Sequence, residues 1–225
     1  MLKAIIFDFD GIIADTEPTH LEAFKKVLEE IDISLNDNDY YENFLAFDDK
    51  KLFSEILKIN NREIQENFVE TLIKKKNVLV TSFFSEYVVL FPGFQNFLGK
   101  VKNNYRLSIA SGALKSEIVF VLEKFNIENE FSVITAADDV LNCKPDPEVF
   151  IKSLKSLNEA NNEAILPDEC LVIEDSVYGI EAAKKANMKC LAMTHTYSAD
   201  YLKDADIVVN NYNDLDMAKV EEIFI

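Results

Sequence analysis

The sequence has only three cysteines, and their number and spacing argue against folds held together by disulfides or by zinc. Cys143, Cys170 and Cys190 are odd in number and form no CxxC pair, so they predict neither a disulfide framework nor a zinc site. We expect Cys170 and Cys190 to be buried as small apolar side chains. Histidine is scarcer still, with two residues, and the chemistry predicted below requires neither of them.

Basic side chains and long apolar runs are also in short supply. The sequence has 23 lysines and arginines against 40 acidic side chains. The resulting formal charge of -17 argues against a nucleic acid or an anionic membrane as partner. No segment approaches membrane-spanning length, and the apolar run within residues 1–7 is too short for a signal peptide. We therefore expect a cytoplasmic protein.

Six short apolar runs predict buried strands, and most of them are followed by amphipathic helical patterns. The predicted strands are residues 4–7, 107–110, 133–135, 170–173, 190–193 and 207–209. Strands and helices that alternate at this period are typical of a parallel sheet covered on both faces. The sequence therefore predicts an α/β fold with a doubly wound, Rossmann-like core.

Residues 15–90 interrupt this alternation with amphipathic helical patterns and no recognisable strand. We expect them to form an all-helical cap domain, inserted into a catalytic core made of residues 1–14 and 91–225. The first cap helix is expected to begin near Pro18. A run of three lysines, Lys74, Lys75 and Lys76, is expected to lie at a solvated helix end. The alternative is that these lysines reach a second anionic group of the substrate.

Acidic side chains directly follow the first predicted strand, at Asp8 and Asp10, with Gly11 next in the chain. In open α/β sheets, ligands bind beyond the carboxyl ends of the strands, where these two carboxylates are expected. A pair of acids at alternate positions is as readily a solvated loop. This segment alone does not decide the function.

Three later segments place polar groups at comparable positions. Ser111 and Gly112 follow the second sheet strand and offer a hydroxyl and a turn amide to phosphate oxygens. Lys144 lies in a loop that two prolines stiffen just before a helix. Glu174 and Asp175 follow a further strand. Each signal is common by itself, since loop lysines are usually solvated and acids before a helix usually cap it.

Taken together, the four segments resemble the haloacid dehalogenase-like hydrolase superfamily over nearly the whole chain. Asp8, Asp10 and Gly11 match the first motif of that family, Ser111 the second, Lys144 the third, and Glu174 with Asp175 the fourth. Residues 15–90 lie where the family inserts a helical cap. Its phosphatases and phosphomutases carry an aspartate at the position of Asp10 and its dehalogenases do not, so the resemblance implies phosphoryl transfer.

The resemblance implies a catalytic role for four side chains. Asp8 is the expected nucleophile, which forms an aspartyl phosphate, and Asp10 the general acid and then the base for water. Ser111 and Lys144 are expected to hold the phosphate. Since both the carboxylate and the substrate are anions, their repulsion must be suppressed by positive charge.

A magnesium ion is the cofactor that the resemblance implies. Mg²⁺ prefers oxygen ligands, and the expected donors are Asp8, the backbone carbonyl of Asp10 and Asp175. Glu174 is expected either to bind the ion directly or to hydrogen-bond its ligands.

Substrate contacts are expected from Gly11, Gly112 and His20. His20 lies on the predicted entry helix of the cap, where the family has its hinge, and the alternative is a plain surface histidine. His195 follows a predicted strand and is expected to be a loop residue without a role.

The function that we predict is hydrolysis of a small phosphomonoester, such as a sugar phosphate, by a monomer or weak homodimer. The alternative is a hexose phosphomutase of the beta-phosphoglucomutase type, in which a cap loop with a glycine and a basic residue helps to hold the second phosphate. Residues 43–51 here read NFLAFDDKK and lack that glycine and an arginine. A catalytically idle binding protein is the third possibility, disfavoured because every acid and the lysine of the motifs are present.

Overall fold

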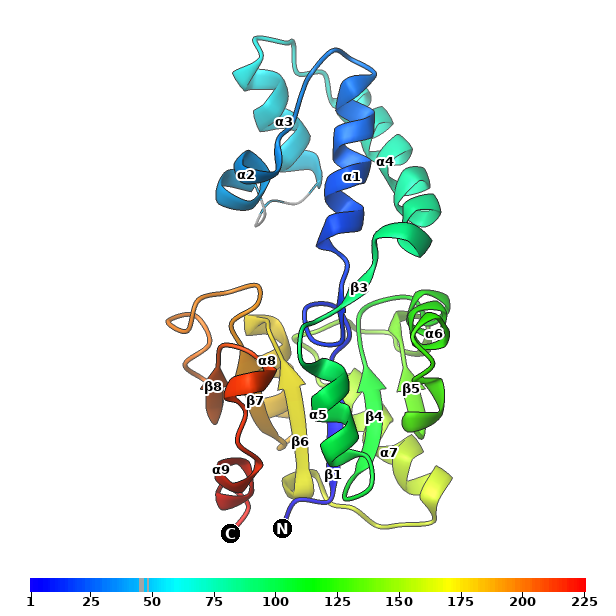
Figure 1. The fold of residues 1–225 in the computed structure, drawn as a ribbon, viewed down its shortest axis with the longest axis vertical. Coiled ribbons are helices and arrows are strands. Elements are labelled where there is room, and N and C mark those ends of the chain that lie inside the picture. The colour runs from blue at the N-terminus through cyan, green and yellow to red at the C-terminus, as the bar shows by residue number, and fades with distance from the viewer. Residues whose placement is uncertain (45–46, 48) are drawn as a thin grey trace. The chain divides into compact units, whose positions relative to one another are not determined.

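The computed structural model describes residues 1–44, 47 and 49–225, which form two compact units (Figure 1). Met1–Asp15 and Leu90–Ile225 make up one of them, called the core unit below. Thr16–Val89 make up the other, called the helical unit. That these units act as a catalytic core and a substrate-selecting cap stays a prediction.

The core unit is built on a six-stranded parallel sheet in the order β5-β4-β1-β6-β7-β8. The strands are β1 (Ala4–Phe7), β4 (Arg106–Ala110), β5 (Val133–Thr135), β6 (Cys170–Glu174), β7 (Lys189–Met193) and β8 (Ile207–Val209). They are short and apolar because a parallel strand is buried on both faces. The predicted α/β fold with a parallel sheet and a helical insertion is confirmed.

Alternation along β1 sends its side chains to two different layers. Ala4 and Ile6 belong to a buried cluster with side chains of two helices, α7 (Glu148–Asn161) and α8 (Val177–Lys185). Phe7 points to the other face, where its ring makes edge-to-face contacts with Phe94, Phe97 and Phe131 at centroid distances of 5.8–6.2 Å. The sheet is thus covered on both sides.

The remaining helices of the core unit are α5 (Phe94–Val101), α6 (Lys115–Lys124) and α9 (Met217–Glu222). Short 3₁₀ turns lie at Glu128–Glu130, Ala137–Asp139, Pro167–Glu169 and Tyr212–Asp214. Cys170 and Cys190 are buried, as predicted, and Cys143 is exposed.

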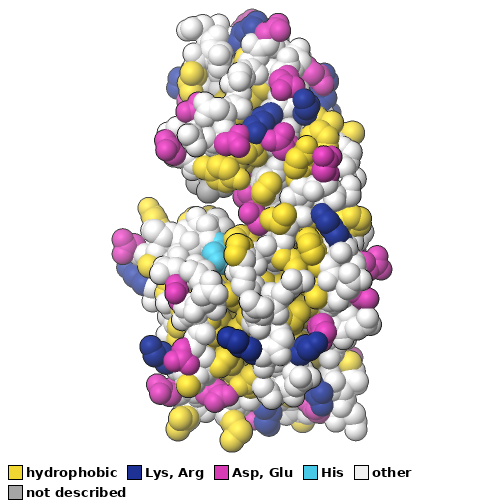
Figure 2. Space-filling view, viewed as in Figure 1, with side chains coloured by type: hydrophobic (Ala, Val, Ile, Leu, Met, Phe, Trp, Pro, Cys, Tyr) yellow, Lys and Arg dark blue, Asp and Glu magenta, His cyan; other side chains and the backbone are white. Residues whose placement is uncertain are grey.

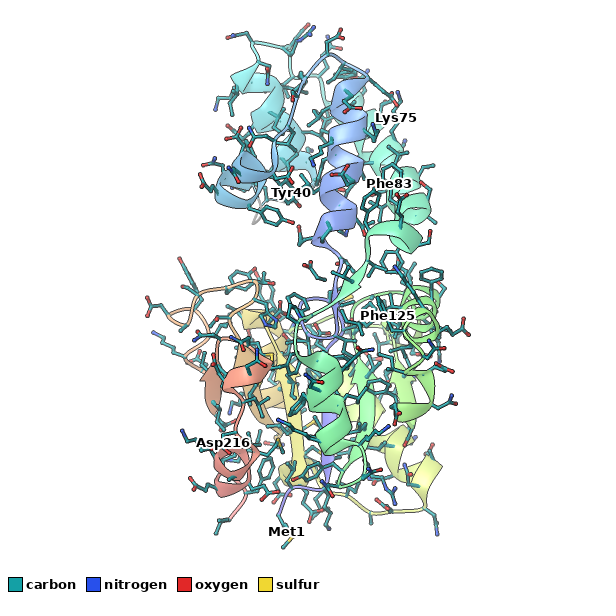
Figure 3. The ribbon with its side chains drawn as sticks, in the orientation of Figure 1. Met1, Tyr40, Lys75, Phe83, Phe125 and Asp216 are labelled. Carbon is teal, nitrogen blue, oxygen red and sulfur yellow. The ribbon has the colours of Figure 1, made fainter. Side chains whose placement is uncertain are left out.

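The helical unit contains α1 (Glu17–Glu29), α2 (Asp37–Asp39), α3 (Asp49–Ile59) and α4 (Glu66–Tyr87), with a π-helical turn at Tyr40–Phe44. Its apolar core includes Leu28, Phe53 and Leu72, and α4 packs against both α1 and α3. Tyr40, labelled in Figure 3, donates a hydrogen bond from its hydroxyl to Glu17 Oε2 at 2.6 Å. The second half of this segment is a single 22-residue helix, α4.

The expectation of no strand between residues 15 and 90 is wrong at both margins. β2 (Ala14–Asp15) and β3 (Val89–Leu90) form a two-stranded sheet. Elements of two residues are too short to show the alternation by which a strand is recognised in a sequence.

The lysine run on α4 does not form a solvated helix end. Lys76 is 3% exposed, and its Nζ donates to both carboxylate oxygens of Asp49, at 2.8 and 3.0 Å. Its ammonium also lies 4.8 Å from the ring centroid of Phe24. Lys75, labelled in Figure 3, is exposed and pairs with Glu30. The prediction fails for Lys76 because it lies within the helix and faces α1 and α3.

Within residues 1–44, 47 and 49–225, no helix combines the length and apolarity that crossing a bilayer requires. On the face of the core unit drawn in Figure 2, lysine and arginine side chains lie among acidic ones. That the protein has no nucleic acid or membrane partner stays a prediction.

Candidate active site

Asp8 lies directly beyond β1, where the backbone of three neighbouring strands brings polar side chains together. β1 pairs with β4 on one side and β6 on the other, and the amide of Asp8 still donates to the Ile173 carbonyl at 2.9 Å. The side chain is buried, at 7% exposure for the residue. Its position is therefore set by the interior of the sheet rather than by a mobile loop.

Lys144 reaches Asp8 from 136 residues away in the sequence. Its Nζ donates to Asp8 Oδ1 at 2.7 Å and to Glu174 Oε1 at 2.6 Å, and lies 5.0 Å from the ring centroid of Phe150. Burial alone would lower the pKa of Lys144, but the two carboxylates outweigh it and the pKa is raised. The ammonium therefore stays charged.

The loop that carries Lys144 is fastened to the start of α7. The carboxylate of Glu148 accepts hydrogen bonds from the amides of Leu141 and Asn142, each at 2.9 Å, and its own amide donates to Asp146 Oδ1. These bonds fix the loop on both sides of Lys144 and so direct its side chain inward.

Glu174 is fully buried at the end of β6 and holds Lys144 in place. Its second oxygen, Oε2, accepts from the amides of Asp175 and Ser176 and from the Ser176 hydroxyl, at 2.9–3.0 Å. The Ser176 hydroxyl in turn accepts from the amide of Gly179 and caps α8. The carboxylate thus joins the lysine to the first turn of a helix.

Two glycines make room for these acids. A Cβ on Gly179 would lie 1.8 Å from the carboxylate of Glu174, and a Cβ on Gly11 would lie 1.8 Å from Asp175 Oδ2. Gly11 also has a φ of +75°, which favours glycine. Gly11, in the first motif, therefore leaves the space that the carboxylate of Asp175, in the fourth motif, fills.

Replacing Gly179 with alanine is expected to lower the free energy of unfolding by about 1–3 kcal/mol, because the added methyl displaces a buried carboxylate. Gly99 is the matched control, since it is also helical but a Cβ there would have nothing within 4 Å. Gly99→Ala is expected to raise stability by about 0.5–1 kcal/mol. Urea unfolding of both variants measures the difference, and equal stabilities would contradict the close approach to Glu174.

Three buried carboxylates form a set that a divalent cation fits. Asp8, Glu174 and Asp175 each offer an oxygen within 4.8 Å of the other two. Burial, opposed by Lys144 and reinforced by Glu174, raises the pKa of Asp8 to about 6, and burial with the neighbouring acids raises the pKa of Asp175 well above its usual value. Lys144 alone leaves this site short of positive charge. Oxygen donors of this kind suit Mg²⁺.

Other residues predicted for the site lie around this group or elsewhere. Ser111 is buried beyond β4, next to β1 in the sheet, and its Oγ accepts from the Ala113 amide at 3.1 Å; Gly112 is exposed. Asp10 is half-buried, and its carboxylate is not among the three that converge. Their predicted roles stay predictions.

His20 belongs to the helical unit and is not a plain surface histidine. Burial lowers its pKa to about 4, helped by the charge of Lys76 and opposed by Asp49. Neutral at ordinary pH, it lies in the neighbourhood of the buried Lys76–Asp49 pair. Its predicted contact with substrate stays a prediction.

Sequence reasoning missed two consecutive residues after β7. His195, expected to have no role, has its Nδ1 2.5 Å from the Gly11 carbonyl oxygen, and the Thr196 hydroxyl donates to Asp175 Oδ2. Burial lowers the pKa of His195, against the Gly11 carbonyl and Asp15, which raise it. The signal that could have found them is the one that found the others, a position beyond the carboxyl end of a sheet strand.

A protein-family model described as haloacid dehalogenase-like hydrolase matches residues 5–193. The chain belongs to this family. The resemblance read from the four motifs is therefore confirmed.

This haloacid dehalogenase-like hydrolase has relatives that match it over most of their length. It is 31% identical to a phosphorylated carbohydrates phosphatase of Thermotoga maritima over 192 residues, which cover 84% of this chain and 83% of that protein. It is 30% identical to the beta-phosphoglucomutase of Bacillus subtilis over 233 residues, covering 98% and 95%. A crystal structure of beta-phosphoglucomutase from Clostridium difficile is 28% identical, with a TM-score of 0.69 and coverage of 100% and 97%.

Proposed function

We propose that this hydrolase is a Mg²⁺-dependent phosphatase that releases phosphate from a small phosphomonoester, a sugar phosphate or a similar metabolite. The observation that carries the proposal is Lys144, whose side chain is 13% exposed and is hydrogen-bonded at once to Asp8 and Glu174. An ammonium in contact with a buried carboxylate provides the positive charge that lets that carboxylate approach a phosphate ester.

In the proposed reaction, Asp8 attacks phosphorus and the bond to the ester oxygen breaks. Asp10 gives a proton to the leaving oxygen, so that an alcohol departs and an aspartyl phosphate remains. Asp10 then takes a proton from a water molecule, which attacks the aspartyl phosphate, releases inorganic phosphate and restores Asp8. Ser111 and Lys144 hold the phosphoryl oxygens, together with the backbone at Gly11 and Gly112.

Asp8, Asp175 and the backbone carbonyl of Asp10 are the groups that would hold Mg²⁺. When bound, the ion would withdraw negative charge from the phosphoryl oxygens. Glu174 has four hydrogen-bond donors on its two oxygens, which supports a role in orienting Lys144 and Asp175 rather than in binding the ion.

The choice of a sugar phosphate draws on the relatives, one a phosphatase of phosphorylated carbohydrates and another a beta-phosphoglucomutase. Mutase activity is the second candidate, favoured by the 30% identity over nearly the whole chain. An observation against mutase activity comes from Asp49, which lies in the stretch that corresponds to the phosphate-holding cap loop. Its carboxylate accepts two hydrogen bonds from Lys76, so this lysine is already paired with an acid. Leu45, Ala46 and Asp48 of that stretch lie outside the described residues.

A screen of phosphorylated sugars and related metabolites, with Mg²⁺ and with a chelator, tests the proposal. We expect phosphate release from at least one compound and its loss in the chelator. Interconversion of glucose 1-phosphate and glucose 6-phosphate, dependent on a bisphosphate activator and without phosphate release, would replace the phosphatase by the mutase. No turnover of any compound would favour an idle binding protein, and turnover unaffected by the chelator would contradict the metal site.

A further inference from the structure

The two residues after Thr194, just beyond β7, contact both acid-bearing loops of the candidate site. His195 is hydrogen-bonded to the carbonyl of Gly11, the residue after Asp10. Thr196 is hydrogen-bonded to the carboxylate of Asp175. Gly11 and Asp175 are themselves in close contact, since a Cβ on the glycine would overlap Asp175 Oδ2. The four residues therefore form a closed ring of contacts that joins segments 184 and 21 residues apart in the chain.

The hydrogen bond of His195 has a defined direction. A backbone carbonyl can only accept, so Nδ1 must carry the proton and donate it, whatever the charge of the ring. The ring is held parallel to that of Phe91, at a centroid distance of 4.1 Å and an interplanar angle of 1°. The amide of Phe91 donates to the carbonyl of Ile13 at 3.1 Å. Stacking thus fixes the plane in which Nδ1 points at the turn.

A second aromatic side chain supports the same turn. The hydroxyl of Tyr212 donates to the carbonyl of Ile12 at 2.8 Å, and its ring packs against Phe94 and Phe97. Two consecutive carbonyls after Asp10 are therefore held by side chains from the C-terminal part of the chain. Glycine is free to adopt several backbone conformations, so these external bonds add to the backbone hydrogen bond from the Gly11 amide to the Ala14 carbonyl in selecting one.

Thr196 acts on the other loop. Its hydroxyl donates to Asp175 Oδ2, the same oxygen that lies against Gly11. Because Oδ2 is held by this hydrogen bond, Oδ1 is the oxygen of Asp175 that would bind a cation. A hydrogen bond to the second oxygen of a carboxylate ligand fixes the direction of the first.

We propose that His195 and Thr196 are positioning residues that set the turn of Asp10 and the carboxylate of Asp175 at a fixed separation. The His195 part rests on the proposed phosphatase function, and the Thr196 part rests on the proposed metal site. A displacement of about 1 Å in a catalytic group can cost on the order of 10²-fold in rate. The dipeptide thus controls both the proton-transfer geometry of Asp10 and the affinity for Mg²⁺.

Two substitutions separate the hydrogen bond of His195 from its stacking. His195→Phe keeps a ring against Phe91 but has no donor, whereas His195→Asn places an amide nitrogen near the position of Nδ1 and loses the ring. We expect H195F to lower kcat about 10-fold or more with little change in KM, and H195N to restore most of kcat. If H195F does not fold, His195→Leu replaces it, because leucine is smaller and also lacks a side-chain donor.

Metal binding tests Thr196 without any turnover. Calorimetric titration with Mg²⁺ is expected to show about 10-fold weaker binding in Thr196→Val, which removes the hydroxyl at nearly constant volume. Thr196→Ser keeps the hydroxyl and is expected to bind as the parent does. Urea midpoints of all variants separate these effects from a loss of folding.

Equal kcat in the parent and in H195F, or in its replacement H195L, would overturn the positioning role of His195. An H195N variant no faster than the donor-free variant would overturn it as well. Parent-like Mg²⁺ affinity in T196V would overturn the role of Thr196. A parent enzyme without phosphatase activity would instead refute the proposed function, and the calorimetric comparison would still decide the Thr196 contact.

Discussion

Asp8→Asn is expected to reduce phosphate release on the order of 10⁴-fold or more, the largest loss of activity that a single substitution in this chain should cause. The amide of asparagine is not a nucleophile towards phosphorus, so no aspartyl phosphate can form. Its Oδ1 can still accept the hydrogen bond from Lys144, which keeps the local structure. Initial rates on the best compound of the screen, at saturating Mg²⁺, measure the effect.

Mass spectrometry of acid-quenched enzyme gives a second measurement of the same prediction. The parent should carry one phosphoryl group during turnover and Asp8→Asn none. Asp168→Asn is the matched control, because Asp168 lies at the opposite, amino-terminal end of β6. If Asp8→Asn kept more than a tenth of the parent rate, or still became phosphorylated, another residue would have to be the nucleophile.

Lys144→Met is expected to lower the rate by about 10²–10³-fold and to destabilise the protein by about 3–5 kcal/mol in the absence of divalent cations. Methionine fills the volume of the aliphatic part of lysine, so the losses of rate and of stability both result from removal of the charge. Without it, Asp8 and Glu174 are left as buried acids without their shared ammonium. Urea unfolding in chelator and in Mg²⁺ measures the stability, and Mg²⁺ should recover part of it.

Lys155→Met is the control for removal of a lysine from the same region. Lys155 lies on α7, its side chain is 76% exposed, and it pairs with Glu159 at 3.9 Å. Exposed pairs of this kind contribute little, so neither rate nor stability should change. If Lys144→Met behaved like Lys155→Met, the ammonium would not be what balances the buried acids.

The sheet and the acids at its edge were predictable because both depend on local patterns. Runs such as Ala4–Phe7 are apolar at every position, as buried parallel strands must be, and their carboxyl ends meet at one edge of the sheet. The residues next in the chain after each strand therefore pointed to Asp8, Glu174 and Asp175, which the structure brings together. Lys144 required the family resemblance, since a lysine in a loop is usually solvated and the two prolines beside it do not by themselves indicate a catalytic role.

The buried Lys76 and the contacts of His195 could not be predicted in this way. Three consecutive lysines on a helix point in three directions, and only packing against other helices decides which one is buried. The partner of Lys76 is 27 residues away and the partner of His195 is 184 residues away. Gly11 was predicted to touch substrate, whereas its contact with Asp175 depends on how two loops meet.

The place of β1 in the sheet has a consequence for synthesis of the chain. β1 precedes both of its neighbours, β4 and β6, in the chain, so its second partner does not exist until Ile173 has been made. The apolar core of the helical unit, by contrast, lies within Thr16–Val89 and can form earlier. Non-local parallel pairing is slow and leaves apolar segments exposed. The segment that carries the proposed nucleophile is thus made before its partners, pairs late, and is accessible to chaperones during translation.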